Sequence, residues 1–459
     1  MSQINVAGRR AVQVSAMNDT NLIARYDGRV PRYTSYPTAP HFSPQVDAVA
    51  YGQWLEALPE GAALSLYLHV PFCDRLCLYC GCNTTVVLKE APKRLYAAHL
   101  QREIALVAAR LGRRARVTAI HWGGGTPTSL PGDCLTGIMA QLRALFDVAA
   151  EAEIAIEIDP TSVTPAILAT LAEMGVNRAS LGVQDFCPEV QEAIGRHQSY
   201  AQTWRCAQAM RGLGITSLNL DLIYGLPFQT AESVARTARQ ALALGAERIA
   251  VFGYAHVPWM KKHQSLIRDE TLPDAAARFA QTGIIRQILV EEGGYVPVGL
   301  DHFALPGDAM AQAAREGVLH RSFQGYTTDA APVLIGLGAS AIGTLPRGYV
   351  QNASSVPAYN AAIARGEFAV ARGVALNAED VLRRGVIEAI MCDLAADIPP
   401  SLHDDAAGLA RFVADGLVQW DGHRLEVTER GRPFVRNVAA LFDAYLQPIS
   451  GAPRHATAV

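Results

Sequence analysis

The sequence predicts an α/β protein whose parallel strands form a sheet of barrel type, followed by a smaller and mostly helical domain. Two observations predict the barrel. Strand-like apolar runs alternate with amphipathic helical runs, which is typical of a parallel sheet, and unusual motifs follow the strand ends, where parallel barrels place their active sites. A third observation, a change of pattern near residue 370, predicts the second domain.

The expected elements follow in chain order after a polar lead of about 20 residues. The strand candidates are residues 64–70, 117–122, 153–158, 178–183, 217–224, 248–255 and 295–300, and the clearest helices are 93–111 and 231–245. The strands are nearly continuous apolar runs, which predicts helices on the outer face of the sheet.

The pattern after residue 370 predicts helices at 377–394, 409–417 and 432–446, with a hairpin turning at Asp421-Gly422. Helices with one hairpin resemble a winged-helix module. We therefore expect an N-terminal extension (1–55), a catalytic barrel (56–365), a C-terminal helical domain (366–447) and a flexible tail (448–459).

Composition excludes several classes of protein. The 459 residues carry a formal net charge of −3, so we expect no nucleic-acid surface, which needs a basic excess. Apolar runs of about 18 residues, which a membrane span needs, do not occur, and the N-terminus lacks the apolar core of a signal peptide. We expect a cytoplasmic protein with no membrane partner.

Polar and glycine-rich motifs follow the predicted strands. They are the cysteine run at 73–82, Gly123-Gly124-Gly125-Thr126-Pro127, Glu157 with Asp159, Gln184-Asp185, Asp221 with the turn at 224–227, and Tyr254-Ala255-His256. Turn residues alone would explain one or two of these motifs. Because parallel strands open onto one face, we expect the whole set to converge there.

Four of the eight cysteines lie within ten residues, as Cys73-x3-Cys77-x2-Cys80-x-Cys82. Such a run in a cytosolic chain indicates metal binding before disulfides. Three thiolates can hold three corners of an iron–sulfur cubane and leave one iron open. Zinc also accepts cysteines, but its structural sites usually pair two separated CxxC knuckles, and a second knuckle is absent. Zinc and a plain electron-carrier cluster stay as alternatives.

The CxxxCxxC spacing resembles the signature of the radical S-adenosylmethionine superfamily. The resemblance implies a partial (β/α)6-type radical SAM barrel, a 4Fe–4S cluster on Cys73, Cys77 and Cys80, and S-adenosylmethionine on the open iron. Cleavage of that cofactor would give a 5′-deoxyadenosyl radical. The three glycines at 123–125 permit close backbone approach to a cofactor; Tyr79 can stack on adenine and Glu157 can accept from ribose hydroxyls.

Longer segments resemble oxygen-independent coproporphyrinogen III oxidases from about residue 20 to 447. They are PRYTSYPTA (31–39), LYLHVPFC (66–73), CGCN (80–83), HWGGGTPT (121–128), GVQDF (182–186), NLDLIYGLP (219–227), DHFA (301–304), GVLHRSFQGYTT (317–328) and GLGASAI (336–342). The resemblance implies oxidative decarboxylation of two propionates of coproporphyrinogen III to vinyls in haem biosynthesis. Removing an unactivated hydrogen from a propionate suits a radical, because no side-chain base takes so weak an acid.

The resemblance also implies two bound S-adenosylmethionine molecules and a set of site residues. The first molecule would contact Tyr67, Tyr79, Gly124, Glu157, Ala255 and Ile342, and the second Gly125, Thr126, Gln184, Arg196 and Asp221, with Phe323 and Gln324 near it. We expect catalytic roles for Tyr67, His69, Cys82 and Gln324, although a satisfied structural role for His69 is an equal alternative. Cys82 is expected not to bind the cluster. Arg32 is the candidate for meeting a substrate propionate, with a plain surface arginine as its alternative.

Two other functions stay open from the sequence. One is a haem-binding chaperone with the same barrel and no oxidase activity, although such relatives generally lack the fourth cysteine and the PRYTSYP segment. The other is an electron-transfer protein, which would have no use for Gly124, Glu157 and Gln184. For the oxidase we expect a flavodoxin- or ferredoxin-type electron donor and a monomer.

Overall fold

The computed structural model describes residues 21–446. The predicted polar lead and the tail at 448–459 lie outside the described residues. Within residues 21–446, none of the helices has the length and apolar character that a membrane span requires.

Six parallel strands form the centre of the fold, in the order β1-β4-β5-β6-β7-β8. They are β1 (Leu64–Val70), β4 (Arg116–Gly124), β5 (Asp147–Ile158), β6 (Arg178–Gln184), β7 (Ser217–Tyr224) and β8 (Arg248–Gly253). Each is parallel to its neighbours. The order confirms the predicted partial (β/α)6 barrel, and the first six strand predictions match these strands closely.

Antiparallel strands extend the sheet on both sides to twelve strands. Next to β1 lies β13 (Val333–Leu337), which is still parallel, and then β14 (Ile342–Leu345), β15 (Gly348–Asn352) and β16 (Val370–Ala375). Next to β8 lie β10 (His302–Ala304) and β9 (Val296–Val298). The sequence patterns did not predict β13 to β16; the GLGASAI segment (336–342) runs from the end of β13 to the start of β14.

The prediction of a strand at 295–300 in the parallel set is wrong. The segment forms the three-residue strand β9, antiparallel to β10 at one edge of the sheet. Pro297 lacks the N–H that an interior strand would donate, and Gly299 has a φ of +54°, so the chain can only form a short edge strand here.

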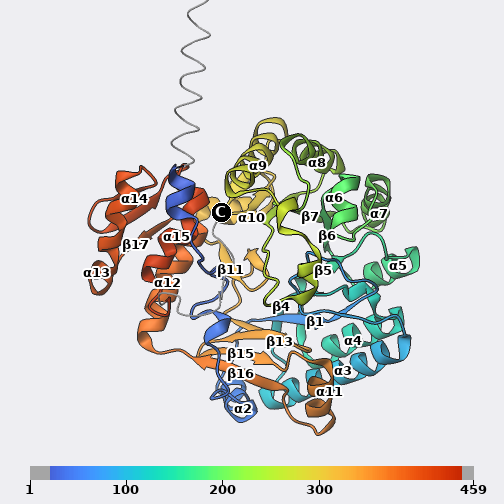
Figure 1. Ribbon diagram of the computed structural model, residues 1–459. Helices are drawn as coiled ribbons and strands as arrows, with labels where there is room; N and C mark the ends of the chain where they lie inside the picture. Colours follow the sequence, from blue (N-terminus) through green and yellow to red (C-terminus); the bar gives the residue numbers. More distant parts are fainter. Residues whose placement is uncertain (1–20, 447–459) are drawn as a thin grey trace, which may run out of the picture.

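Helices cover the outer face of the parallel strands, as Figure 1 shows. They are α3 (Glu90–Leu111), α4 (Gly132–Leu145), α5 (Pro165–Glu173), α6 (Pro188–Ala193), α7 (Tyr200–Gly212), α8 (Ala231–Leu244) and α9 (Ala275–Gln287). In α8, Thr230 and Ser233 form a capping box and Gly245 ends the helix in a left-handed conformation. One face of α8 buries Val234, Ala238 and Ala241 against the sheet.

The remaining elements connect or flank the sheet. They are η1 (Ala39–His41), α2 (Ala48–Glu56), β2 (Phe72–Cys73), β3 (Thr85–Val86), η2 (Pro127–Ser129), η3 (Lys262–Leu266), η4 (Asp269–Thr271), a π-helical turn η5 (Ile288–Glu292), α10 (Ala309–Glu316), β11 (His320–Ser322), β12 (Gly325–Thr327) and α11 (Val356–Ala364).

The C-terminal part contains the predicted hairpin and helices. Its elements are α12 (Ala378–Asp393), β17 (Ala395–Asp397), η6 (Pro400–Leu402), α13 (His403–Ala406), η7 (Ala407–Leu409), α14 (Ala410–Ala414), β18 (Val418–Trp420), β19 (Arg424–Val427), η8 (Arg432–Phe434), α15 (Val435–Ala439) and η9 (Ala440–Phe442). The hairpin β18–β19 turns at Gly422, whose φ is +98°. The predicted helix 432–446 is a short α-helix between two 3-10 turns, and it ends before Asp443, whose backbone is extended.

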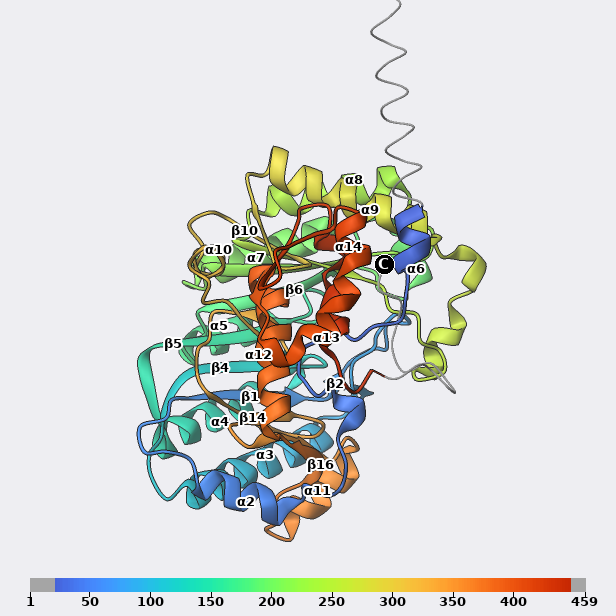
Figure 2. The same ribbon diagram turned by 90° about the vertical axis from the view of Figure 1, so that its left-hand side faces the viewer.

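The N-terminal segment packs on this C-terminal part. Residues 21–26 are helical, and the Tyr26 ring stacks on Phe412 with 4.7 Å between ring centroids. Figures 1 and 2 both show the N-terminal helix, in blue, against the red C-terminal elements. Because β16 belongs to the large sheet, we propose that the C-terminal domain begins after residue 375 and shares its core with residues 22–36.

Candidate functional site

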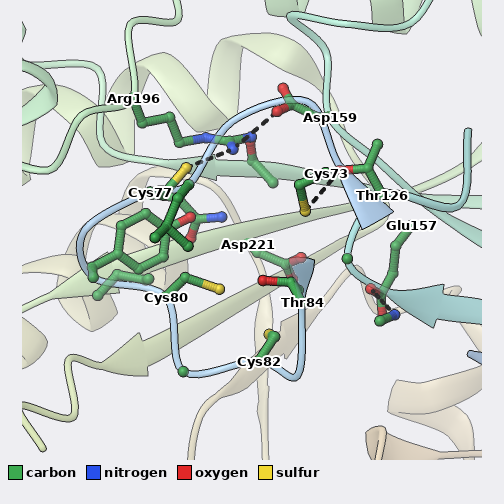
Figure 3. A pocket seen from close by; sticks show the side chains of 18 of the residues that line it. Cys73, Cys77, Cys80, Cys82, Thr84, Thr126, Glu157, Asp159, Arg196 and Asp221 are labelled. Carbon is green, nitrogen blue, oxygen red and sulfur yellow. Dashed lines mark hydrogen bonds and ion pairs between the residues drawn. The ribbon is translucent and has the colours of Figure 1, made fainter. Parts of the chain in front are cut away.

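A cavity of about 740 Å³ opens at the C-terminal ends of the parallel strands. Figure 3 shows the side chains that line it. Fourteen of the predicted site residues line this cavity: Arg32, Cys73, Cys77, Tyr79, Cys80, Cys82, Gly124, Gly125, Thr126, Glu157, Gln184, Arg196, Asp221 and Ala255. Twelve of them come from the ends of β4, β5, β6, β7 and β8 and from the loop after β1, whereas Arg32 lies in the N-terminal segment and Arg196 follows α6. The predicted convergence of scattered motifs on one face therefore occurs.

The cysteine loop leaves the sheet directly after β1. Strand β2 pairs in parallel with β3, so the chain from 74 to 84 forms one excursion between two fixed strands. Gly125 and Thr126 donate their N–H groups to Val70 O and Phe72 O, at 2.8 Å each. A Cβ at Gly125 would lie 2.7 Å from Phe72 O and 3.0 Å from the Sγ of Cys73. Only glycine allows the two loops to lie this close.

The thiols of Cys73, Cys77 and Cys80 all face the cavity, as Figure 3 shows. Within residues 21–446, no group of three or more His, Cys, Asp or Glu side chains is placed so that it could hold one metal ion. A cubane takes each thiolate on a different iron, so its ligands need not converge on one point. The donor set of three soft thiolates fits such a cluster, and these three cysteines would hold it.

Polar hydrogens already face two of these sulfurs. The Thr126 hydroxyl lies 3.6 Å from the Sγ of Cys73, and Arg196 Nη1 lies 3.7 Å from the Sγ of Cys77. Burial raises the pKa of Cys73 to about 11, whereas a hydrogen bond from the Cys82 thiol lowers the pKa of Cys80 to about 6. Cys82 is exposed, unlike the other three.

Arg196 is held by three acceptors besides Cys77. It donates to Asp159 Oδ2 at 3.2 Å, to Gly182 O at 2.7 Å and to Gln198 Oε1 at 3.1 Å. Asp159 also accepts from Thr161 and lies 3.5 Å from Arg75. Although burial opposes it, Arg196 and Thr161 keep the pKa of Asp159 below its ordinary value. The carboxylate thus fixes the cation beside the cluster loop. Asp159 was seen at a strand end in the sequence but was not assigned this role.

The backbone of the cysteine loop is clamped by the segment that follows β8. Lys261 Nζ donates to Cys82 O at 2.8 Å, His263 Nε2 to Cys80 O at 2.7 Å, and Gln264 Nε2 to Tyr79 O at 2.8 Å. Sequence reasoning missed this clamp. The segment WMKKHQSL carries no motif, and its side chains donate to main-chain carbonyls. Every residue has such a carbonyl, so the sequence gives no sign of the pairing.

The glycine run of β4 forms one wall of the cavity. The Gly124 N–H donates to Glu157 Oε2 at 3.1 Å. Gly124 has a φ of +115°, and a Cβ there would lie 2.7 Å from the His69 ring. At Gly123 a Cβ would lie 2.7 Å from Glu157. The wall is therefore flat backbone, and Glu157, whose side chain is 39% exposed, lines the cavity beside it, where it can accept from a ligand hydroxyl.

His69 does not line the cavity. Its Nε2 lies 3.1 Å from Asn83 O, which can only accept, so Nε2 carries the proton and Nδ1 accepts from the Tyr67 hydroxyl at 3.1 Å. Burial lowers the pKa of His69. Both ring nitrogens are satisfied in the neutral ring, which is the structural alternative left open by the sequence. Tyr67 lies behind Gly123, within 3.0 Å of a Cβ built there.

The opposite wall carries amides and a carboxylate. Asp221 accepts from Ser180 at 2.9 Å and from Asn219 at 2.8 Å, and burial raises its pKa to about 6. Gln184 has a φ of +66° beside a bulge in β6. Bulges next to active sites re-aim side chains, and this one brings Gln184 to the cavity beside Arg196.

Besides Tyr67 and His69, three more predicted residues lie away from the cavity lining. Phe323 packs against Phe42 and Tyr349, Gln324 bonds with Ser322, and Ile342 begins β14. The lining therefore does not include them in this conformation. Arg32 does line it, and its Nη2 donates to Gly253 O at 3.0 Å.

Comparison with known proteins agrees with this geometry. The Radical SAM superfamily matches residues 67–241. Oxygen-independent coproporphyrinogen III oxidase from Bradyrhizobium diazoefficiens is 50% identical over 94% of this chain and 97% of its own length. The enzyme of that name from Paracoccus denitrificans is 45% identical over 93% and 96%.

A solved structure is similar over nearly the whole described fold. Coproporphyrinogen III oxidase from Escherichia coli, named as a radical SAM enzyme, superposes with a TM-score of 0.85 at 38% identity, covering 91% of this chain and 100% of that one. The chain therefore belongs to the oxygen-independent coproporphyrinogen III oxidase family of the radical SAM superfamily.

Proposed function

We propose that this chain converts two propionate side chains of coproporphyrinogen III to vinyl groups without oxygen, giving protoporphyrinogen IX. The observation that carries the proposal is the cavity in which three cysteine thiols face a flat glycine wall at the strand ends. The match to relatives of that name over more than nine tenths of the chain supports the proposal.

The reaction explains why such a site is needed. Each conversion removes one hydrogen atom from the propionate carbon next to the ring, then CO2 and one electron, which passes to a one-electron acceptor, and leaves a carbon–carbon double bond. Bound at the cysteines, the 4Fe–4S cluster with S-adenosylmethionine supplies the 5′-deoxyadenosyl radical that takes the hydrogen. The protein supplies position and keeps water and side reactions out.

We assign the first S-adenosylmethionine to the wall made by Gly124, Glu157, Tyr79 and Ala255. The flat backbone at Gly124 admits a ligand, and Glu157 can accept hydrogen bonds from its hydroxyls. Main-chain and side-chain acceptors suit a cationic amino group. Tyr67 and Ile342, the other predicted contacts of this molecule, lie outside the lining, so their contribution would be indirect.

A second S-adenosylmethionine is assigned to Gly125, Thr126, Gln184, Arg196 and Asp221, which line the same cavity. Arg196 can pair with the cofactor carboxylate, and Asp221 with its amino group. The catalytic roles predicted for Cys82 and Gln324 stay predictions. In this conformation the Gln324 side chain is hydrogen-bonded to Ser322.

We also propose a cytoplasmic monomer that takes electrons from a flavodoxin- or ferredoxin-type protein. Clustered free thiols suit a reducing compartment. The cysteine loop reaches the surface, where Leu76 is 40% exposed, so a docked donor would need only a short electron path. Size-exclusion chromatography tests the monomer, and reduction of the cluster by each type of donor tests the partner.

The decisive experiment is an anaerobic assay with coproporphyrinogen III, reductant and S-adenosylmethionine. Iron and sulfide are quantified on the same sample that is assayed for 5′-deoxyadenosine, CO2 and vinyl product. We expect all three products. Stoichiometric haem binding without CO2 release would instead identify a haem chaperone, and a cluster without cofactor cleavage would identify an electron carrier.

A further inference from the structure

A second cavity, of about 270 Å³, lies between α9, the C-terminal part and the N-terminal segment. It shares Arg32 and the chain from Phe252 to Ala255 with the larger cavity. The two spaces therefore adjoin at the C-terminal end of β8. Phe279 of α9 stacks on Phe434 of η8 with 5.9 Å between ring centroids, so α9 packs on the C-terminal part beside this cavity.

Arginines dominate the lining of the second cavity. Six arginines stand against two acids, Asp301 and Glu429, and the arginines are Arg32, Arg278, Arg286, Arg430, Arg432 and Arg436. The whole chain has a formal net charge of −3. Positive charge is thus concentrated around this cavity in a chain that is slightly negative overall, and the arginines come from three separate parts of the chain.

Part of this charge has a structural explanation. Glu429 pairs with both Arg286 and Arg432, and Arg432 also donates to Gly299 O at 2.7 Å. These bonds join the C-terminal part to the barrel. Asp301 is hydrogen-bonded to His302 at 2.8 Å.

Arg32 and Arg278 pair with main-chain groups rather than with acids. They donate to the main-chain carbonyls of Gly253 and Tyr254, at 3.0 and 2.9 Å, and a carbonyl carries no full charge. Within residues 21–446, the buried Nε of Arg278 has no hydrogen-bond partner. Burial and the neighbouring Arg32 lower the pKa of Arg436 to about 10. Cations gathered this closely are expected to attract an anion.

The packing holds Arg278 in place. A Cβ at Gly225, whose φ is +81°, would lie 2.6 Å from Arg278 Nη1, and the guanidinium lies 5.8 Å from the centroid of the Tyr224 ring. The side chain therefore lies along a backbone without side chains and points to the shared wall of the two cavities. A fixed guanidinium loses little freedom when it binds a carboxylate.

The chemistry of the substrate indicates which anion belongs here. Coproporphyrinogen III has four propionates, two of which are lost as CO2 and two of which remain in the product. An arginine paired to a reacting carboxylate would stabilise the group that must leave and would slow its loss. A propionate that remains is charged throughout and needs a permanent partner, at a distance from the radical.

We propose that the arginine cavity around Arg278 and Arg436, with Arg32 at its entrance, binds the propionates that the reaction does not remove. The inference rests on the proposed function, since it takes the substrate from it. The macrocycle then spans the opening between the two cavities, and the reacting propionates point toward the cysteine loop. Arg32, which the sequence suggested as a partner for one substrate propionate, is then part of a larger anion site and lies at its edge.

The test uses the full-length enzyme, purified anaerobically with its cluster. Binding of coproporphyrin III, a stable fluorescent tetracarboxylate, is titrated by fluorescence and compared with its uncharged tetramethyl ester. For Arg278→Gln we expect the Kd for the acid to rise about tenfold or more, with little change for the ester. Arg278→Lys should recover part of the loss.

Controls separate this result from a folding defect. Arg239→Gln removes an exposed arginine of α8 that pairs with Glu292, and it should leave the Kd for coproporphyrin III unchanged. Arg32 is exposed, so Arg32→Gln should fold even if Arg278→Gln does not, and should weaken acid binding in the same way. If both variants bind the acid within about twofold of wild type, or if wild type does not distinguish acid from ester, the anion site is overturned.

The proposed function can fail separately. A wild-type enzyme that binds coproporphyrin III but forms neither CO2 nor vinyl product would refute the decarboxylase, and the assignment to unreacted propionates would fall with it. A wild-type enzyme that turns over, with Arg278→Gln and Arg32→Gln unimpaired in binding and KM, would refute the anion site alone.

Discussion

Arg196 Nη1 lies 3.7 Å from the Sγ of Cys77 and ties the first turn of the cysteine loop to the end of β6. The same guanidinium pairs with Asp159 at 3.2 Å, so its position is fixed before a cluster binds. A permanent cation beside a thiolate ligand stabilises the more negative, reduced state of the cluster that it holds.

Replacing Arg196 with methionine should make the cluster harder to reduce. Removing one charge a few ångströms from the ligand, and leaving Asp159 unbalanced, should lower the reduction potential by an amount on the order of 100 mV. An EPR-monitored redox titration measures it. Arg196→Lys keeps the charge and should restore most of the potential, and an equal potential in the methionine variant would contradict the electrostatic role.

Cys77 and Cys82 should respond differently to serine, although both belong to one short run. Both line the cavity, but Cys77 is buried whereas Cys82 is exposed. Cys77→Ser should lose the brown colour, the iron and all cofactor cleavage. Cys82→Ser should keep a near-normal iron content but should turn over more slowly than wild type. Iron analysis with the visible spectrum decides, and a 4Fe–4S signal that survives in Cys77→Ser would refute the ligand assignment.

Gly124→Ala should damage the cofactor wall. The new Cβ would lie 2.7 Å from the His69 ring, at a φ of +115°, so strain and clash together should cost about 2–4 kcal/mol of unfolding free energy and weaken S-adenosylmethionine binding. Gly61→Ala is the matched control. It has a φ of +81° in open space and should cost about 1 kcal/mol with normal binding. Equal losses in the two variants would show that the close contact is unimportant.

The parallel strands, the outer helices and the cysteine loop could be predicted because each leaves a periodic or clustered signal in the sequence. The segment of β9 was wrongly assigned to the parallel set, because an apolar run does not show whether a strand lies at the edge or in the centre of a sheet. Only Pro297, which has no N–H to donate, indicates an edge strand here. The clamp through His263 and Gln264 acts on carbonyls, which every residue has. Phe323 was placed near the second cofactor by resemblance; its ring packs on Tyr349, and its place near a cofactor stays a prediction.

Asp221→Asn should stabilise the fold at neutral pH while it harms the site. Burial raises the pKa of Asp221 from 3.8 to about 6, so the folded state binds its proton more tightly than the unfolded state. Wild-type stability from this group is therefore present at low pH and is lost as pH rises from about 4 to 6, by up to about 3 kcal/mol. An amide lacks the charge but places a donor against Ser180 or Asn219 at a cost of about 1 kcal/mol.

Thermal melts at pH 7.5 and pH 5 test this prediction. The variant should melt above wild type at pH 7.5, and the difference should shrink at pH 5, where part of the wild-type carboxylate is protonated. S-adenosylmethionine binding should weaken at both values. A constant difference in melting temperature across this range would mean that Asp221 titrates normally.

Gln264→Ala should loosen the cysteine loop from outside the cluster. The side chain is fully buried and bonds to Val257 N–H at 2.7 Å and to Tyr79 O at 2.8 Å, so its loss leaves both groups unsatisfied, at about 2–3 kcal/mol of local stability. Tyr79 lies between two cluster ligands, so opening there exposes the cluster. We expect normal iron on anaerobic purification but faster bleaching in air. Ser265→Ala changes the exposed neighbour and should bleach at the wild-type rate, and if Gln264→Ala matches it, the clamp does not protect the cluster.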